Sequence, residues 1–138
     1  MKRIIGFDYG TKKLGVAVSD PLRITAQPVD TVTVKKADEL PERLSEIFSE
    51  YDAEKVVVGL PLNMNGTEGE TAAEARAFAD RIKEEFNLEV VMWDERLSSR
   101  TVERAMLEDN MRRRKRRNRK DIMAAVVILQ NYLDFISG

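Results

Sequence analysis

Residues 55–59 (KVVVG) form a short apolar run that is followed at once by the turn-rich loop of residues 60–69. A continuous apolar run of this length is typical of a strand buried on both faces, as in the centre of a parallel sheet. A second strand-like run, residues 89–93 (EVVMW), follows a stretch with helical spacing. Strands that alternate with helices predict an α/β fold with parallel crossovers.

Three further strand-like segments precede this alternating part. Residues 3–9 and 14–19 are apolar and flank the turn-like sequence GTKK, so they predict a hairpin. Residues 29–34 alternate valine with polar residues, which suits a third strand with one exposed face. We therefore expect a five-stranded mixed sheet, with three antiparallel strands first and parallel crossovers after them.

Helical spacing of apolar residues predicts helices over residues 40–51, 70–86, 98–110 and 121–136. The last segment is apolar on most sides, as expected of a helix packed firmly against a sheet. Neither a repeat nor a linker divides the sequence, and 138 residues suffice for one hydrophobic core. We expect a single domain over residues 1–138, with helices covering the faces of the sheet.

The composition excludes several kinds of chemistry. The chain contains no cysteine and no histidine, which rules out disulfides, thiol catalysis, zinc fingers and histidine-based acid–base schemes. Catalysis must then use carboxylates, hydroxyls, lysines or metals. No apolar run approaches the roughly 20 residues of a membrane span. The sequence also starts directly with a strand-like segment instead of a signal peptide. We expect a soluble, cytoplasmic protein with no membrane partner.

Carboxylates follow the first and the fifth predicted strands, and another opens the last helix. Sites in open α/β sheets form beyond the carboxyl ends of the strands. Asp8 lies at the end of the first strand, and either Asp94 or Glu95 lies at the end of the fifth. These acids can converge if the fourth strand lies between the first and the fifth in the sheet. Asp121 joins them if the last helix packs back across the sheet. Three carboxylates in a cleft suit Mg²⁺ or Mn²⁺.

Each acid also has a purely structural interpretation. Asp8 can start the turn into the second strand, and Glu95 can be a solvated residue paired with Arg96. Asp121 is a natural N-cap or first-turn acid. The residues alone leave these alternatives open.

Residues 112–120 (RRRKRRNRK) concentrate positive charge. They hold eight of the 23 basic residues. The rest of the chain has 15 basic and 24 acidic residues, and therefore a net charge of −9. A basic segment on an acidic body indicates local contact with a polyanion. We favour phosphate binding over a solvated charge cluster for this basic run.

Four ordered segments resemble the YqgF (RuvX) family of RNase H-like nucleases. They are residues 6–20 (GFDYGTKKLGVAVSD), 56–69 (VVVGLPLNMNGTEG), 93–103 (WDERLSSRTVE) and 120–134 (KDIMAAVVILQNYLD). The resemblance spans essentially the whole chain and implies an RNase H-like fold. It assigns the active-site carboxylates to Asp8, Glu95 and Asp121, and thus favours Glu95 over Asp94. The sequence departs from the family pattern at Asn65, where aspartate is more typical, and in the length of the basic run.

The resemblance also implies an activity, which is metal-dependent endonucleolytic hydrolysis with two Mg²⁺ or Mn²⁺ ions. The implied substrates are structured RNA, at the 5′ end of pre-16S ribosomal RNA, or branched DNA such as a Holliday junction. A monomer could process RNA, whereas a symmetric junction calls for a homodimer. The residues expected to bind nucleic acid are Arg96, Arg112, Arg113, Arg114, Lys115, Arg116, Arg117, Arg119 and Lys120.

Two other classes of function stay open. Residues 8–18 (DYGTKKLGVAV) also resemble the phosphate-binding strand-turn-strand of actin-like ATPases, which would make the chain an ATP-binding half-domain. A single copy of this length lacks the second phosphate loop of those enzymes. Alternatively, the protein is a non-catalytic nucleic-acid-binding module in which the acids only cap helices and start turns.

Overall fold

In a computed structural model of the chain, the described residues are 2–10, 12–33, 40–63, 65–95 and 119–137, with the backbone alone for residues 119–121. The elements in chain order are β1 (Arg3–Tyr9), β2 (Lys13–Ser19), β3 (Ala26–Thr33), α1 (Leu40–Glu50), β4 (Ala53–Leu60), α2 (Glu70–Phe86), β5 (Glu89–Asp94) and α4 (Arg119–Ser137). The helix predicted over residues 98–110 lies outside this part of the chain. None of the helices among the described residues is long and apolar enough to cross a membrane.

The five strands form one mixed sheet in the order β3-β2-β1-β4-β5. β1 pairs antiparallel with β2 and β2 with β3, whereas β4 is parallel to both β1 and β5. This order confirms the predicted sheet, including the crossover that brings β4 beside β1. The strand that carries Asp8 is therefore central, and β4 separates it from the strand that leads to Glu95.

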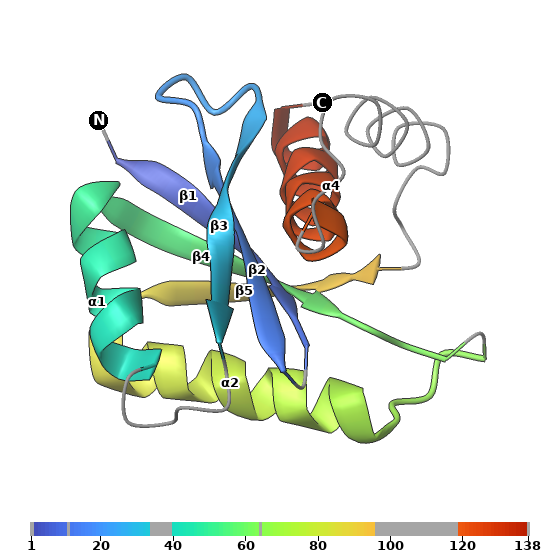
Figure 1. The fold of residues 1–138 in the computed structure, drawn as a ribbon. Coiled ribbons are helices and arrows are strands. Elements are labelled where there is room, and N and C mark those ends of the chain that lie inside the picture. The colour runs from blue at the N-terminus through green and yellow to red at the C-terminus, as the bar shows by residue number, and fades with distance from the viewer. Residues whose placement is uncertain (1, 11, 34–39, 64, 96–118, 138) are drawn as a thin grey trace.

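Helices cover both faces of the sheet (Figure 1). On one face, Ile5 and Phe7 of β1 pack in a core with residues of α1 and α2. On the other face, Ile4 of β1 and Val57 of β4 pack against α4. Successive side chains of a strand point to opposite faces. This alternation therefore decides on which face each candidate site residue lies.

Helix α4 approaches β1 closely at a glycine. A Cβ atom placed on Gly6 would lie 2.7 Å from Cβ of Leu129 and 3.4 Å from the carbonyl oxygen of Ala125. The absence of a side chain at Gly6 thus allows this close packing. Polar contacts fix the helix further along, because the side chain of Gln130 accepts a hydrogen bond from Ala26 N (2.9 Å) and donates one to Ile24 O (2.9 Å).

The starts of three elements differ from the sequence prediction by two or three residues. β4 begins at Ala53 instead of Lys55. β3 begins at Ala26, three residues before the predicted start, and therefore includes Pro28. Proline is tolerated there because β3 is an edge strand with β2 as its single partner. The N–H that proline lacks is therefore not needed for pairing on the outer side of β3. Helix α4 begins at Arg119, two residues earlier than predicted, so Asp121 belongs to its first turn and does not precede the helix.

Candidate active site

Asp8 lies near the carboxyl end of β1, on the face of the sheet that α4 covers. Ile4 on the same strand packs in the α4 core, and Gly6 lies directly under Leu129. Alternation along the strand places Asp8 on this face too. The next residue, Tyr9, belongs to the opposite face, where its ring packs on Phe78 with 5.3 Å between ring centroids.

Glu95 follows β5 directly and lies on the same face as Asp8. Val91 and Trp93 of β5 pack against the α4 core, so alternation directs Glu95 to this side as well. The side-chain position agrees with this expectation. A Cβ atom placed on Gly59 would lie 2.6 Å from Oε1 of Glu95 and 2.5 Å from Cδ1 of Ile128. The Glu95 carboxylate therefore lies over Gly59, beside α4.

The register of the sheet brings this carboxylate towards Asp8. Phe7 pairs with Val58 between the parallel strands β1 and β4, so the next residue on each, Asp8 and Gly59, are also neighbours. Neighbouring strands are about 4.8 Å apart. The carboxylate of Glu95, which lies over Gly59, is thus about one strand away from Asp8 on the same face.

Asp94, the competing acid, lies on the other side of the sheet. It pairs with Leu60 at the end of β4, and it alternates with Trp93 and Glu95. Val90 and Met92 share its orientation and pack against the core under α1 and α2. Geometry thus separates the two acids that the residues alone left as alternatives.

The backbone of Asp121 lies at the end of α4 that points to this edge of the sheet. Tyr132 of α4 contacts Lys55 near the start of β4, whereas Ile128 contacts Gly59 near its end. The N-terminal end of α4 therefore lies towards the carboxyl end of β4. Asp121 lies about two turns beyond Ile128 in this direction. The first turn of α4 thus extends towards the edge that carries Asp8 and Glu95.

Glycines surround Asp8 on this face of the sheet. Gly15 is its partner on β2, Gly59 is its neighbour on β4, and Gly6 precedes it on its own strand. The two residues directly opposite Asp8 on the flanking strands, Gly15 and Gly59, therefore have no side chain. The residues fit a divalent cation in this respect, because a Cβ atom at Gly59 would meet Oε1 of Glu95, and carboxylate oxygens are the ligands that hard cations prefer.

Among the side chains that the structure describes, no group of three acids lies close enough to hold a metal ion. The side chain of Asp121 is outside that set. The described part of the candidate site therefore consists of the carboxylates of Asp8 and Glu95 and the glycine between them. Gly59 was not singled out from the sequence, although a glycine within a valine-rich strand is a signal of close approach.

The predicted nucleic-acid-binding residues lie almost entirely outside the described part of the chain. This holds for Arg96 and for the basic run up to Arg117. The backbones of Arg119 and Lys120 form the first residues of α4, so the run continues into the helix that carries Asp121. The binding role of these residues stays a prediction.

The loop after β4 forms a small hairpin beside this edge, closed by a bridge between Leu62 and Glu68. Oδ1 of Asn65 accepts hydrogen bonds from the backbone N–H of Thr67 (3.1 Å) and from its hydroxyl (2.6 Å). An aspartate oxygen would accept the same two bonds. The departure of Asn65 from the family pattern is therefore compatible with this loop structure.

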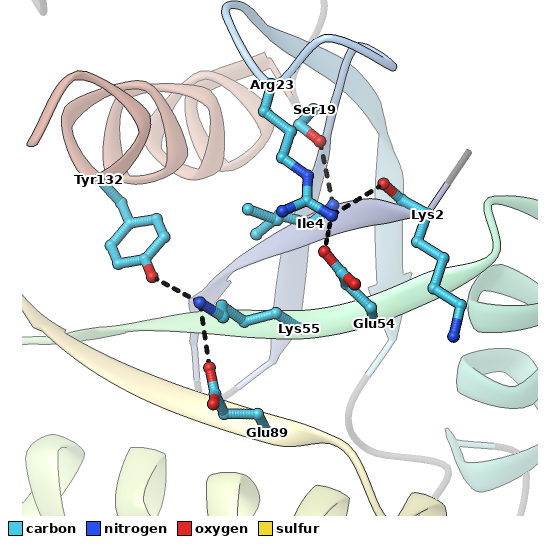
Figure 2. A network of polar contacts seen from close by, with 8 residues as sticks. All are labelled: Lys2, Ile4, Ser19, Arg23, Glu54, Lys55, Glu89 and Tyr132. Carbon is cyan, nitrogen blue, oxygen red and sulfur yellow. Dashed lines mark hydrogen bonds and ion pairs between the residues drawn. The ribbon is translucent and has the colours of Figure 1, made fainter. Parts of the chain in front are cut away.

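A polar network lies at the opposite end of the parallel strands (Figure 2). Lys55 at the start of β4 donates to the hydroxyl of Tyr132 (3.1 Å) and pairs with Glu89 of β5 (3.0 Å). The hydrogen bond to Tyr132 and then the bond to Glu89 raise the pKa of Lys55. Arg23 pairs with Glu54 nearby. The network connects β4, β5 and α4 far from the candidate site.

Replacement of Tyr132 by phenylalanine is expected to lower the free energy of unfolding by about 1 kcal/mol, the usual value of one hydrogen bond. The ring would keep its edge contact with Trp93, at 5.7 Å between centroids, so no cavity should form. Urea denaturation at neutral pH measures the effect. Because folding raises the pKa of Lys55, this stabilisation is complete below the ordinary value of 10.5 and is lost as the pH rises through the folded value. An unchanged stability at pH 7 would contradict this assignment.

Comparison with known proteins places the chain among nucleases. The sequence model of a family described as "RuvX: Holliday junction resolvase" matches residues 2–135. A relative from Geobacillus kaustophilus (strain HTA426) is 49% identical over 96% of this chain and 97% of its own length. A relative from Agathobacter rectalis is 45% identical over 99% of this chain and 97% of its own length. Both are named "Putative pre-16S rRNA nuclease".

Solved structures show the same fold at low sequence identity. T. thermophilus RuvC in complex with a Holliday junction substrate aligns with a TM-score of 0.72 at 13% identity, covering 99% of this chain and 96% of the other. The Fowlpox virus resolvase in complex with Holliday junction DNA aligns with a TM-score of 0.62 at 13% identity, covering 99% of each chain. These likenesses confirm the predicted α/β fold of the RNase H-like type.

Proposed function

This chain belongs to the RuvX family of nucleases, and we propose that it is a metal-dependent endonuclease that cleaves precursor ribosomal RNA at the 5′ end of pre-16S rRNA. The observation that carries the chemistry is the approach of the Glu95 carboxylate to Asp8 over Gly59 on one face of the sheet. The substrate follows from relatives that match nearly the whole chain and are named for this RNA.

We assign the metal ligands to Asp8, Glu95 and Asp121. Asp8 is central, with Glu95 beside it and the first turn of α4 extending towards the same edge. When bound, Mg²⁺ or Mn²⁺ supplies Lewis-acid stabilisation of the phosphate and an activated water. The chain has no histidine, so these carboxylates would orient the attacking water in place of a histidine base. Arg96 and the basic run are suited to hold the phosphates on either side of the cut.

Cleavage of Holliday junctions is the second candidate, and the description of the family favours it. A junction has two strands to cut symmetrically, so this activity would require two active sites and hence a homodimer. Cleavage of precursor RNA requires only one site and is compatible with a monomer. A ribosomal RNA substrate would also place the protein in the cytoplasm.

The direct test is a cleavage assay on both substrates. Purified protein is incubated with Mg²⁺ or Mn²⁺ and with RNA that spans the 5′ end of pre-16S rRNA, or with a four-way DNA junction. We expect internal cuts in the RNA that disappear when EDTA removes the metal. Cleavage of the junction alone would favour the second candidate.

Two further measurements, combined with a lack of cleavage in this assay, would reject a nuclease. Salt-sensitive binding of both substrates without cleavage in either metal would favour a nucleic-acid-binding module. A rise in melting temperature with ATP, again without cleavage, would favour the ATP-binding alternative.

A further inference from the structure

We propose that Gly59 is a positioning residue for Glu95, and that the absence of a side chain at Gly59 holds the Glu95 carboxylate beside Asp8. The consequence for metal binding rests on the proposed function, whereas the positioning itself does not. Gly59 belongs to a strand segment that is otherwise rich in valine, which is the residue type that strands favour. Glycine weakens a strand and often marks a place of close approach.

The close approach at Gly59 comes from the candidate ligand itself. A Cβ atom at this position would lie 2.6 Å from Oε1 and 3.2 Å from Cγ of Glu95. Nonbonded carbon atoms are most favourably separated by about 3.5–4.0 Å. Any side chain at position 59 would therefore displace the carboxylate from its place over β4, the strand next to the one that carries Asp8.

The groups that would have to move are the ends of flexible side chains. The second close contact of this Cβ atom is Cδ1 of Ile128, at 2.5 Å. The side chains of Glu95 and Ile128 can move these end groups by a change of rotamer, at a modest cost in free energy. The Gly59→Ala protein should therefore fold, with its main defect in the position of Glu95.

Gly6 provides a matched control on the same face of the sheet. A Cβ atom at Gly6 would meet Cβ of Leu129 at 2.7 Å and the carbonyl oxygen of Ala125 at 3.4 Å. These atoms are part of, or adjacent to, the backbone of α4, so relief requires a shift of the helix. Gly6→Ala should therefore lower the melting temperature clearly more than Gly59→Ala does.

A double-mutant cycle tests whether Gly59 acts through Glu95. The affinity for Mn²⁺ alone is measured by calorimetry for wild type, Gly59→Ala, Glu95→Gln and the double variant. In the wild-type background we expect Gly59→Ala to weaken Mn²⁺ binding roughly 10- to 100-fold, as loss of ligand orientation does in other metal sites. In the Glu95→Gln background we expect Gly59→Ala to have no further effect.

Ile128→Val in combination with Gly59→Ala separates the two close contacts. Valine lacks Cδ1, so this double variant removes the crowding from α4 and keeps the crowding with Glu95. We expect it to bind Mn²⁺ as weakly as Gly59→Ala alone. Recovery of wild-type affinity would overturn the proposal, because the defect would then come from Ile128. The double-mutant cycle gives a second such outcome. The proposal is also overturned if Gly59→Ala weakens Mn²⁺ binding by the same factor in the wild-type background and in the Glu95→Gln background.

A crystal structure of Gly59→Ala distinguishes failure of the proposal from failure of the proposed function. We expect the Glu95 carboxylate to have left its place over β4 while the sheet and α4 are unchanged. A carboxylate that stays there would overturn the positioning role. If the wild-type protein itself binds no Mn²⁺, the proposed metal site fails, and the position of Glu95 in this crystal structure alone decides the proposal.

Discussion

Replacement of Asp8 by asparagine is expected to slow phosphodiester cleavage by about a thousandfold or more, because metal catalysis contributes several kcal/mol and each 1.4 kcal/mol is a factor of ten. Asp8 is the central carboxylate of the candidate site, on the middle strand and flanked by Gly15 and Gly59. Asparagine has nearly the same shape but lacks the negative charge that holds a divalent cation. Single-turnover cleavage of the RNA substrate in Mg²⁺ and in Mn²⁺ measures the effect.

Thermal unfolding provides the control for this variant. Without metal, a cooperative melting transition of Asp8→Asn shows that the variant is folded. With Mn²⁺ at 100 times its dissociation constant, wild type should gain about 2.7 kcal/mol of stability, and the variant should gain far less. Cleavage at the wild-type rate by a folded Asp8→Asn protein would remove Asp8 from the site.

Glu95→Gln is expected to reduce cleavage by about a hundredfold or more, whereas Asp94→Asn should keep most of the activity. The loss of one carboxylate from the proposed metal site should cost about 3 kcal/mol or more of transition-state stabilisation. The two adjacent acids form a matched pair, since each change removes one negative charge. They differ in the face they occupy, because Glu95 lies over Gly59 under α4 whereas Asp94 alternates to the side of α1 and α2.

Cleavage rates and Mn²⁺ affinities of the two variants, measured side by side, check this prediction. Circular dichroism and melting temperature show that both are folded. A larger loss of activity in Asp94→Asn than in Glu95→Gln would contradict the assignment, and it would mean that the face of the sheet under α4 is not the catalytic face.

Much of the fold follows from local sequence patterns. The apolar runs of β1, β2, β4 and β5 and the helical stripes of α1 and α2 predict the bounds of these elements to within two residues. The start of β3 was less well predicted, because Pro28 argues against a strand wherever two partners are needed. Only the sheet order shows that β3 is an edge strand with one partner, where proline is tolerated.

The sequence alone limits which residue types are available for chemistry. Without histidine or cysteine, it left carboxylates at strand ends and at the start of the last helix, among which the family resemblance favoured Asp8, Glu95 and Asp121. It also determined the order of strands and helices, because apolar periodicity is a local property of the chain.

The pairing of strands that are distant in sequence brings Asp8 and Glu95 to one face of the sheet, where they approach each other. These residues are 87 positions apart in sequence, and their separation in space depends on the pairing of β1 with β4 and β4 with β5. Ile128 of α4 also lies against Gly59, so this helix and the Glu95 side chain meet over the same residue. Such long-range contacts are set by sheet register and helix packing, and no local pattern of residues records them.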